Sequence, residues 1–372
     1  METVQCRSVA DVVDAIKRGG RVVPRGGGHC FVDRPADVVL DLSGLKSIDV
    51  RSDGVATIGA GALLGEVYRE LHAAGRALPA GCGTTVGIAG LTLGGGIGLV
   101  GRKYGLTCDR LIGARVVLAD GSVVECDDER EPDLFWALRG AGGGQFGVVT
   151  EFRFDTVAEP MLTRIAADWP ADEPETVIAA WQAWAPDAPD DLTLNLTIDG
   201  PRAVLIGASL LTAEPTRALL AEFADLIGTP VPFELRAGVP LSTVKASFAE
   251  ATREEPPRIR SEFFEQSLSD DVLHELVGTG RLAFTAMGGA YNRIAAAATA
   301  FAHRNQRFLL ETANDRSWSL AHADGSGRVY PNFPNLSLAD GPAAYHGENL
   351  ARLRAVKQAY DPERFFAFPQ AV

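Results

Sequence analysis

Apolar residues recur with helical spacing in two early segments of the chain. In residues 8–18 the apolar positions that share one helical face are Val9, Val12, Val13 and Ile16. Ser8 precedes them and suits an N-cap, because its hydroxyl can accept a hydrogen bond from a first-turn N–H. Residues 63–75 have a similar periodicity that stops at a glycine. The sequence therefore predicts an amphipathic helix in each segment.

Alternating apolar and polar positions predict strands around these helices. Residues 38–50 and 54–62 alternate and are rich in β-branched side chains. Residues 114–127 contain two such runs on either side of Asp120-Gly121, a dipeptide typical of tight hairpin turns. A strand in residues 21–25 is expected to enter the first glycine-rich loop.

The pattern changes after about residue 155, where glycine becomes less frequent. Helical segments at 175–185, 214–228 and 269–278 alternate with β-rich segments at 192–199, 203–211 and 307–313. This order predicts an antiparallel sheet backed by helices, and so an α+β protein with a separate second domain. A charged amphipathic helix at 347–360 lies near the end of the chain. We divide the chain into domains at 1–155 and 156–325, with a C-terminal segment at 326–372.

Composition narrows the class of protein. The chain has 372 residues, 46% of them hydrophobic, and a formal charge of −13, which argues against nucleic-acid partners. The cysteines are Cys6, Cys30, Cys82, Cys108 and Cys126. They form no CxxC pair, so neither a metal site nor a disulfide framework is expected. An N-terminus without an apolar leader and the absence of a long apolar run predict a cytoplasmic protein without a membrane anchor.

Glycine-rich stretches at 26–28, 81–87, 94–98 and 140–147 are the most unusual feature. Glycine costs roughly 0.5–1 kcal/mol against alanine in an ordered segment, so each needs a close backbone approach or a positive φ. Residues 96–101 fit G-x-G-x-x-G, but no acidic residue closes a second strand about 20 positions later, because Asp120 lies in the hairpin turn. Tight turns alone would explain the glycines of one loop, but they explain four such loops poorly. Four loops of bare N–H groups suit a long ligand with a pyrophosphate, such as FAD.

Four segments in order resemble the berberine-bridge-enzyme-like FAD-linked oxidases, which share the vanillyl-alcohol oxidase fold. Residues 25–29, Arg-Gly-Gly-Gly-His, resemble the family's pyrophosphate loop. Residues 89–111 and 133–150 are similar to the second and third flavin segments, and residues 345–370 to the closing segment. The resemblance covers most of the chain and is to short, bacterial members. It implies an FAD-binding domain of the PCMH type, made of two α/β subdomains, beside a substrate domain.

The resemblance also implies which residues hold FAD. His29 stands where the family joins histidine to the flavin 8α-methyl group, and Cys30 fills the adjacent small-residue position. A second, cysteinyl link is not expected, because Cys82 falls one place before the family's cysteine, where this chain has Gly83. The other expected cofactor-binding residues are Arg25, Gly26, Gly27, Gly28, Gly81, Thr85, Val86, Gly87, Gly90, Gly95, Gly96, Gly98, Gln145, Gly147, Val148, Tyr330, Asn332 and Phe333.

The catalytic base is where this chain departs from the family. The family's Y-x-N-Y motif ends in a tyrosine base, whereas this chain reads Tyr330-Pro331-Asn332-Phe333, and phenylalanine has no proton to exchange. Proton removal needs a group whose pKa lies near the working pH. Glu311 is the expected substitute, with an ordinary exposed strand residue as the alternative. Tyr330 and Tyr291 are further candidates, although Tyr291 fits a packed aromatic residue equally well.

These features predict an oxidase. The substrate, small or natural-product-like, would give hydride to flavin N5, and O2 would reoxidise the flavin. A flavin-retaining cyclase or rearrangement enzyme without net redox chemistry is the alternative that the missing tyrosine favours. A ligand-binding protein descended from an oxidase is a third possibility, against which the intact glycine loops argue.

Overall fold

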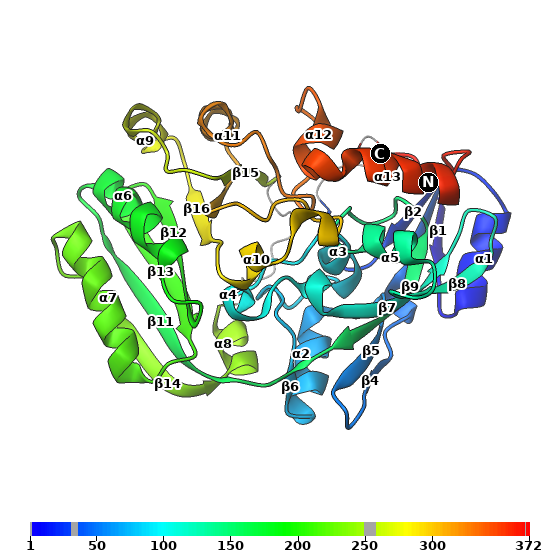
Figure 1. Ribbon diagram of the computed structural model, residues 1–372, viewed down its shortest axis with the longest axis horizontal. Coiled ribbons are helices and arrows are strands. Elements are labelled where there is room, and N and C mark those ends of the chain that lie inside the picture. The colour runs from blue at the N-terminus through cyan, green and yellow to red at the C-terminus, as the bar shows by residue number, and fades with distance from the viewer. Residues whose placement is uncertain (1, 31–35, 249–257, 369) are drawn as a thin grey trace.

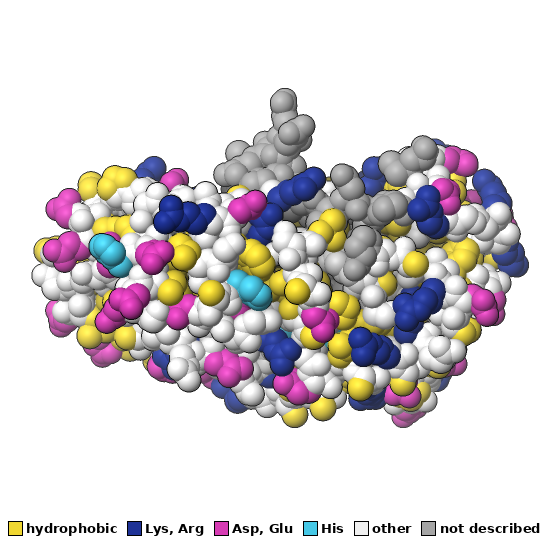
Figure 2. All heavy atoms as spheres, turned by 90° about the horizontal axis from the view of Figure 1, so that it is seen from above, with side chains coloured by type: hydrophobic (Ala, Val, Ile, Leu, Met, Phe, Trp, Pro, Cys, Tyr) yellow, Lys and Arg dark blue, Asp and Glu magenta, His cyan; other side chains and the backbone are white. Residues whose placement is uncertain are grey.

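The structure is a computed structural model that describes residues 2–30, 36–248, 258–368 and 370–372. The N-terminal elements form one half of the molecule, and a large sheet with its helices forms the other (Figure 1). The described residues contain no helix that is long and apolar enough to cross a membrane. On the face in Figure 2, the visible Lys and Arg side chains form separate groups among acidic ones.

A small parallel sheet begins the chain. Its strands, in the order β1-β3-β2, are β1 (Glu2–Gln5), β3 (Val38–Asp41) and β2 (Val22–Arg25). Helix α1 (Val9–Lys17) connects β1 to β2, and the Ser8 hydroxyl accepts a hydrogen bond from the Asp11 N–H. The predicted helix, its cap and the strand that enters the glycine loop are all confirmed.

A five-stranded antiparallel sheet forms the rest of the N-terminal half. Its strands, in the order β4-β5-β9-β7-β8, are β4 (Ile48–Val50), β5 (Val55–Gly59), β9 (Val148–Asp155), β7 (Leu111–Val117) and β8 (Val123–Cys126). The β7–β8 hairpin turns at Gly121, whose φ is +81°, as the sequence predicted. The accompanying helices are α2 (Leu64–Ala73), α3 (Ile88–Leu93), α4 (Gly101–Tyr104) and α5 (Pro132–Leu138).

The second half is built on seven antiparallel strands. In sheet order they are β14 (Glu234–Pro240), β11 (Met161–Pro170), β13 (Arg202–Ser209), β12 (Leu192–Asp199), β16 (Leu282–Ala286), β17 (Phe308–Thr312) and β15 (Arg260–Phe264). The helices that belong to this half include α6 (Pro174–Trp184), α7 (Ala213–Ile227), α9 (Asp270–Leu276) and α11 (Asp315–Asp324). An apolar core that includes Trp181, Phe223 and Phe308 lies between this sheet and its helices. The predicted antiparallel sheet backed by helices is confirmed.

Short elements join the two halves. Strand β6 (Arg76–Ala77) pairs with β10 (Val157–Ala158) beneath the junction. Helix α8 (Leu241–Ser247) packs against α2, and α10 (Ala290–Arg293) packs against α4. Figure 1 shows α4, α8 and α10 between the large sheet and the N-terminal half.

The end of the chain returns to the N-terminal half. Helices α12 (Gly341–His346) and α13 (Leu350–Tyr360) lead to the C-terminus, and α13 packs against α5. Leu353, Val356 and Phe366 belong to the same core as α5. We keep the division at 1–155, 156–325 and 326–372 as our proposed domain organisation.

Candidate functional site

The first two glycine loops pack backbone against backbone. A Cβ at Gly27 would lie 2.8 Å from both the Gly87 Cα and the Thr85 carbonyl oxygen, so only glycine fits there without a shift. Gly28 has a φ of +73°, which L residues rarely adopt. Both reasons that the sequence suggested for the glycines, close approach and positive φ, therefore apply in this one loop.

His29 lies at the end of this loop and reaches the second one. Its Nε2 atom is 3.0 Å from the Thr85 hydroxyl oxygen, and its side chain is half-buried. Cys30 is exposed. Arg25, at the end of β2, pairs with Asp41 on β3 at 3.0 Å. The contact between His29 and Thr85 thus links the loop that follows β2 to the second glycine loop.

Two buried tyrosines hold the third glycine loop. The Tyr330 hydroxyl oxygen accepts hydrogen bonds from the Gly96 N–H (3.0 Å) and the Ile97 N–H (3.2 Å). The Tyr291 hydroxyl donates to the Gly98 carbonyl oxygen at 2.7 Å and accepts from the Gly98 N–H. Burial raises the pKa of Tyr330 to about 12 and also raises that of Tyr291. Both hydroxyls are therefore protonated at neutral pH.

Asn332 and Phe333 extend this arrangement. The Asn332 amide Nδ2 donates to the Tyr330 hydroxyl (2.9 Å) and to the Leu91 carbonyl oxygen (3.0 Å). The Phe333 ring meets Tyr330 edge-on, with 5.2 Å between the ring centroids. The Y-P-N-F segment thus packs against the loop that carries Gly95 and Gly96.

Glu311 lies on the face of the large sheet that carries this cluster. Residues two apart in a strand share a face, and Leu309, two residues before it, packs with Tyr291 and Tyr330. The residue that pairs with Glu311 on the neighbouring strand β15 is Ser261. The Ser261 hydroxyl oxygen accepts a hydrogen bond from the Tyr330 N–H at 3.0 Å. Glu311 is half-buried. It therefore belongs to the wall that faces the glycine loops.

The remaining predicted residues are spread along the same loops. Gly81, Val86 and Gly90 follow one another through the second loop into α3, whereas Gly147 and Val148 lead into β9 beside β7. A Cβ at Gly90 would meet nothing within 4 Å, so the α3 surface is open there.

Cys82 packs in a small apolar cluster with Leu99 and Val239. Burial raises the pKa of its thiol.

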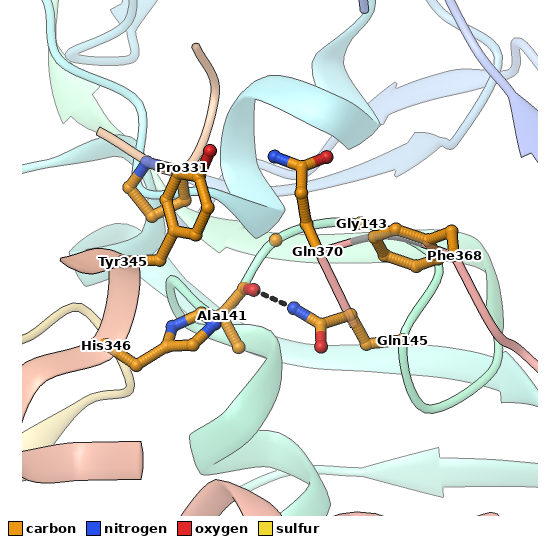
Figure 3. Close-up of a pocket in the computed structure, with 9 residues that line it drawn as sticks. Ala141, Gly143, Gln145, Pro331, Tyr345, His346, Phe368 and Gln370 are labelled. Carbon is orange, nitrogen blue, oxygen red and sulfur yellow. Dashed lines mark hydrogen bonds between the residues drawn. The ribbon is translucent and has the colours of Figure 1, made fainter. Parts of the chain in front are cut away.

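A cavity beside these loops is lined mostly by residues that the sequence analysis did not assign to the site (Figure 3). Its lining consists of Ala141, Gly142, Gly143, Gln145, Pro331, Tyr345, His346, Phe368 and Gln370. Among them only Gln145 was predicted; its side chain donates to the Ala141 carbonyl oxygen and accepts from the Val372 N–H at 3.0 Å. His346 is 1% exposed, and neither ring nitrogen has a hydrogen-bond partner. Burial lowers its pKa to about 4.

Comparison with known proteins identifies the family. Residues 2–127 match the FAD binding domain family, and residues 329–372 match the family described as berberine and berberine like. An uncharacterized FAD-linked oxidoreductase of Bacillus subtilis, YgaK, is 33% identical over 99% of this chain and 90% of its own. This chain belongs to the berberine-bridge-enzyme-like FAD-linked oxidoreductases. It is an FAD-dependent oxidoreductase, and the resemblance drawn from its four segments is confirmed.

Solved structures of this family have the same fold. The BBE-like 1 protein of Physcomitrella patens superposes with a TM-score of 0.90 at 27% identity, over all of this chain and 90% of the other. Glucooligosaccharide oxidase from Acremonium strictum, described with a 6-S-cysteinyl, 8α-N1-histidyl FAD, superposes with a TM-score of 0.86 at 26% identity, over all of this chain and 91% of its own. The predicted PCMH-type fold is confirmed.

The residues of this chain fit FAD on two observations. First, Gly28 and Gly90 leave the loop surfaces open, because a Cβ at either would contact nothing within 4 Å. Second, both nitrogens of His346 and the Gln370 Oε1 atom are buried without partners, although buried polar groups in folded proteins are rarely left so. The second group was missed because the resemblance marked residues 345–370 only as a segment. A buried histidine and glutamine cannot be told from surface ones by spacing alone.

Proposed function

We propose that this BBE-like protein is an oxidase that removes two electrons and two protons from an alcohol-like carbon of a small or natural-product-like substrate. Bound FAD would supply the hydride acceptor and pass the electrons to O2, which would leave as hydrogen peroxide. Support comes from the family, from the glycine loops that approach one another at Gly27 and Gly87, and from the wall that carries Glu311.

His29 would attach the cofactor. Its place behind the glycine loop and its 3.0 Å contact with Thr85 support this role, as does the histidyl link described for glucooligosaccharide oxidase. We propose a single link. Gly83 has no side chain to form a second one, and the neighbouring Cys82 thiol packs among apolar side chains.

Glu311 would take the substrate's hydroxyl proton on a carboxylate oxygen. The two tyrosines are poorly suited to this step, because burial raises their pKa values and so disfavours their deprotonated forms. For Tyr330 this effect exceeds the opposite effect of the Gly96 and Ile97 N–H groups, which donate to its oxygen. We therefore propose that Tyr330 and Tyr291 position the third glycine loop, while Asn332 holds Tyr330.

A second candidate function is a biosynthetic cyclisation or rearrangement without net redox chemistry. The observation that favours it is Phe333, which stands where oxidases of the family carry their tyrosine base. Such an enzyme would keep FAD, but its substrate would not bleach the flavin absorbance under anaerobic conditions.

One series of measurements tests these roles. Purified protein is precipitated with acid, and flavin absorbance is read in the pellet and the supernatant for the parent, for His29→Ala and for His274→Ala. His274 is an exposed residue of α9 and serves as the control. We expect yellow pellets except for His29→Ala. A colourless pellet from the parent would refute the covalent link.

A screen of alcohols for hydrogen peroxide release then tests the oxidase. Glu311→Gln should lower kcat by about 10²–10⁴-fold, the range for a general base, without changing the flavin spectrum. Glu275→Gln, on α9, is the control. Peroxide release that is equal in parent and Glu311→Gln would exclude Glu311 as the base. If no alcohol yields peroxide, and ligands that bind tightly leave the flavin oxidised without O2, the non-redox function is favoured.

A further inference from the structure

The cavity in Figure 3 contains polar atoms that the protein itself does not satisfy. His346 is the last residue of α12, and its ring points into the cavity together with Tyr345. Both ring nitrogens lack a hydrogen-bond partner, although the side chain is 1% exposed. On the opposite side, the Oε1 atom of Gln370 is also buried and unpartnered. Leaving a buried donor or acceptor unpaired costs roughly 1–3 kcal/mol, so three such atoms around one cavity point to a bound molecule.

Two other polar side chains in the lining of the cavity, Gln145 and Tyr345, already form hydrogen bonds. The Gln145 amide is bonded at both ends, to Ala141 and to Val372. The Tyr345 hydroxyl oxygen accepts a hydrogen bond from the Asn335 N–H at 2.6 Å. A ligand is therefore the natural partner for His346 and Gln370.

The position of the cavity indicates which ligand this is. Gly142 donates its N–H to the Leu93 carbonyl oxygen at 2.7 Å, which ties this wall to α3 and the third glycine loop. Pro331, on the other wall, lies between Tyr330 and Asn332. The cavity is thus continuous in sequence and structure with the residues expected to hold FAD.

We propose that His346 and Gln370 bind a polar group of FAD, so that the C-terminal segment closes the cofactor site with hydrogen bonds of its own. A neutral imidazole offers one donor and one acceptor, and the amide oxygen offers an acceptor. The group they meet must therefore both accept and donate, as the ribityl hydroxyls and the flavin imide do, whereas a phosphate only accepts. Burial keeps the imidazole neutral, since it lowers the pKa to about 4. This inference depends on FAD binding and not on the proposed oxidation.

The test measures cofactor affinity rather than turnover. In a His29→Ala background, where FAD can exchange, flavin fluorescence gives the dissociation constant of purified holoprotein on dilution. Adding His346→Phe should weaken FAD binding about tenfold or more, as should Gln370→Met, because each loses a hydrogen bond worth roughly that factor. His346→Gln keeps a donor and an acceptor and should recover part of the loss. His274→Phe, at an exposed residue of α9, should leave FAD affinity unchanged.

Unchanged FAD affinity in both His346→Phe and Gln370→Met would overturn the proposal. Circular dichroism shows whether each variant is folded; if His346→Phe is not, Gln370→Met alone decides. The result is separate from the proposed function. Loss of FAD affinity in variants of a protein that oxidises no substrate would uphold this site and refute only the oxidase.

Discussion

The junction between the two halves is held by buried cations of two kinds, on two sides. On one side Arg102, on α4, reaches into the large-sheet half and bonds only backbone carbonyl oxygens. It donates to Leu192 (3.0 Å), Pro186 (2.7 Å), Ala188 and Met287. On the other side Lys245, on α8, reaches into the N-terminal half. It donates to the Leu78 carbonyl oxygen at 2.8 Å, and its ammonium lies 3.9 Å from the centre of the Tyr68 ring.

The two cations respond differently to the same burial. Burial lowers the pKa of both, but a guanidinium starts so high that it stays charged. The pKa of Lys245 falls to about 7, because desolvation outweighs the electrostatic effects of Cys82 and Glu159, which raise it. On the Arg102 side of the junction, a guanidinium that stays charged donates hydrogen bonds to carbonyl oxygens, and we call this arrangement the Arg102 clamp. On the Lys245 side, the ammonium group changes charge near neutral pH.

Removing the Arg102 clamp should lower the free energy of unfolding more than any other change considered for the junction. Arg102→Met keeps most of the side-chain volume but leaves four carbonyl oxygens without their donor. We expect a loss of roughly 3–5 kcal/mol in the free energy of unfolding, measured by urea denaturation. Arg202→Met is the matched control, because Arg202 pairs with Asp168 on the exposed surface and should matter little. Equal losses in the two variants would show that Arg102 does not hold the junction.

Lys245 gives a second prediction, in pH dependence rather than in stability at one pH. The unfolded side chain has a pKa near 10.5, whereas the folded one has a pKa near 7. Between these values the unfolded chain binds a proton that the folded chain does not, so stability rises with pH. Relative to Lys245→Met, the parent should gain about 2 kcal/mol of unfolding free energy from pH 7 to pH 9.

Comparing the two proteins at each pH cancels the groups that they share. Lys17→Met, at the last turn of α1, serves as the control and should follow the parent. If the difference between the parent and Lys245→Met stays constant from pH 7 to pH 9, the lysine keeps its charge in the folded state. The contrast between the two sides would then fail.

Local patterns in the sequence predicted much of the fold, but they did not predict the buried contacts of Arg102 and Lys245. Helix α1, the hairpin at Gly121 and the antiparallel sheet depend on periodicity and turn residues within a few positions of one another. The glycine loops were located because their composition is unusual. Arg102, Lys245 and His346 are ordinary polar residues in sequence. Their burial depends on residues that are distant in the sequence, such as Leu78 for Lys245. The spacing of residues around Lys245 does not predict that contact.

The candidate site divides in the same way. Its backbone part, from Gly26 to Gly98, could be found because glycine is required wherever two loops approach closely. Its side-chain part could be found only where the family motif fixes the residue, as with His29 and Asn332. The tyrosines were placed near the site, but their hydrogen bonds to the third glycine loop depend on a register between distant segments that local sequence does not encode.

The smallest predicted effect lies on the Lys245 side and sharpens its contrast with the Arg102 side. The Oε1 atom of Glu159 accepts a hydrogen bond from the Ser242 N–H at 2.9 Å. Its Oε2 atom lies 2.5 Å from Nδ1 of His72. Burial opposes the shift, but these two partners lower the pKa of the Glu159 carboxyl. Because the folded pKa is lowered, the carboxylate stabilises the protein at pH values above the unfolded pKa of 4.5, and the gain disappears as the pH falls through the folded pKa.

Glu159→Gln should therefore cost about 1 kcal/mol of unfolding free energy at pH 7 and progressively less as the pH is lowered below about 4. Glu214→Gln, which changes an exposed carboxylate on α7, should follow the parent at every pH. If the cost of Glu159→Gln were the same at pH 3 as at pH 7, the carboxylate charge would contribute nothing there. Lys245 would then be the titrating group on which the pH response of the junction depends, and the contrast with the Arg102 clamp would rest on that one side chain.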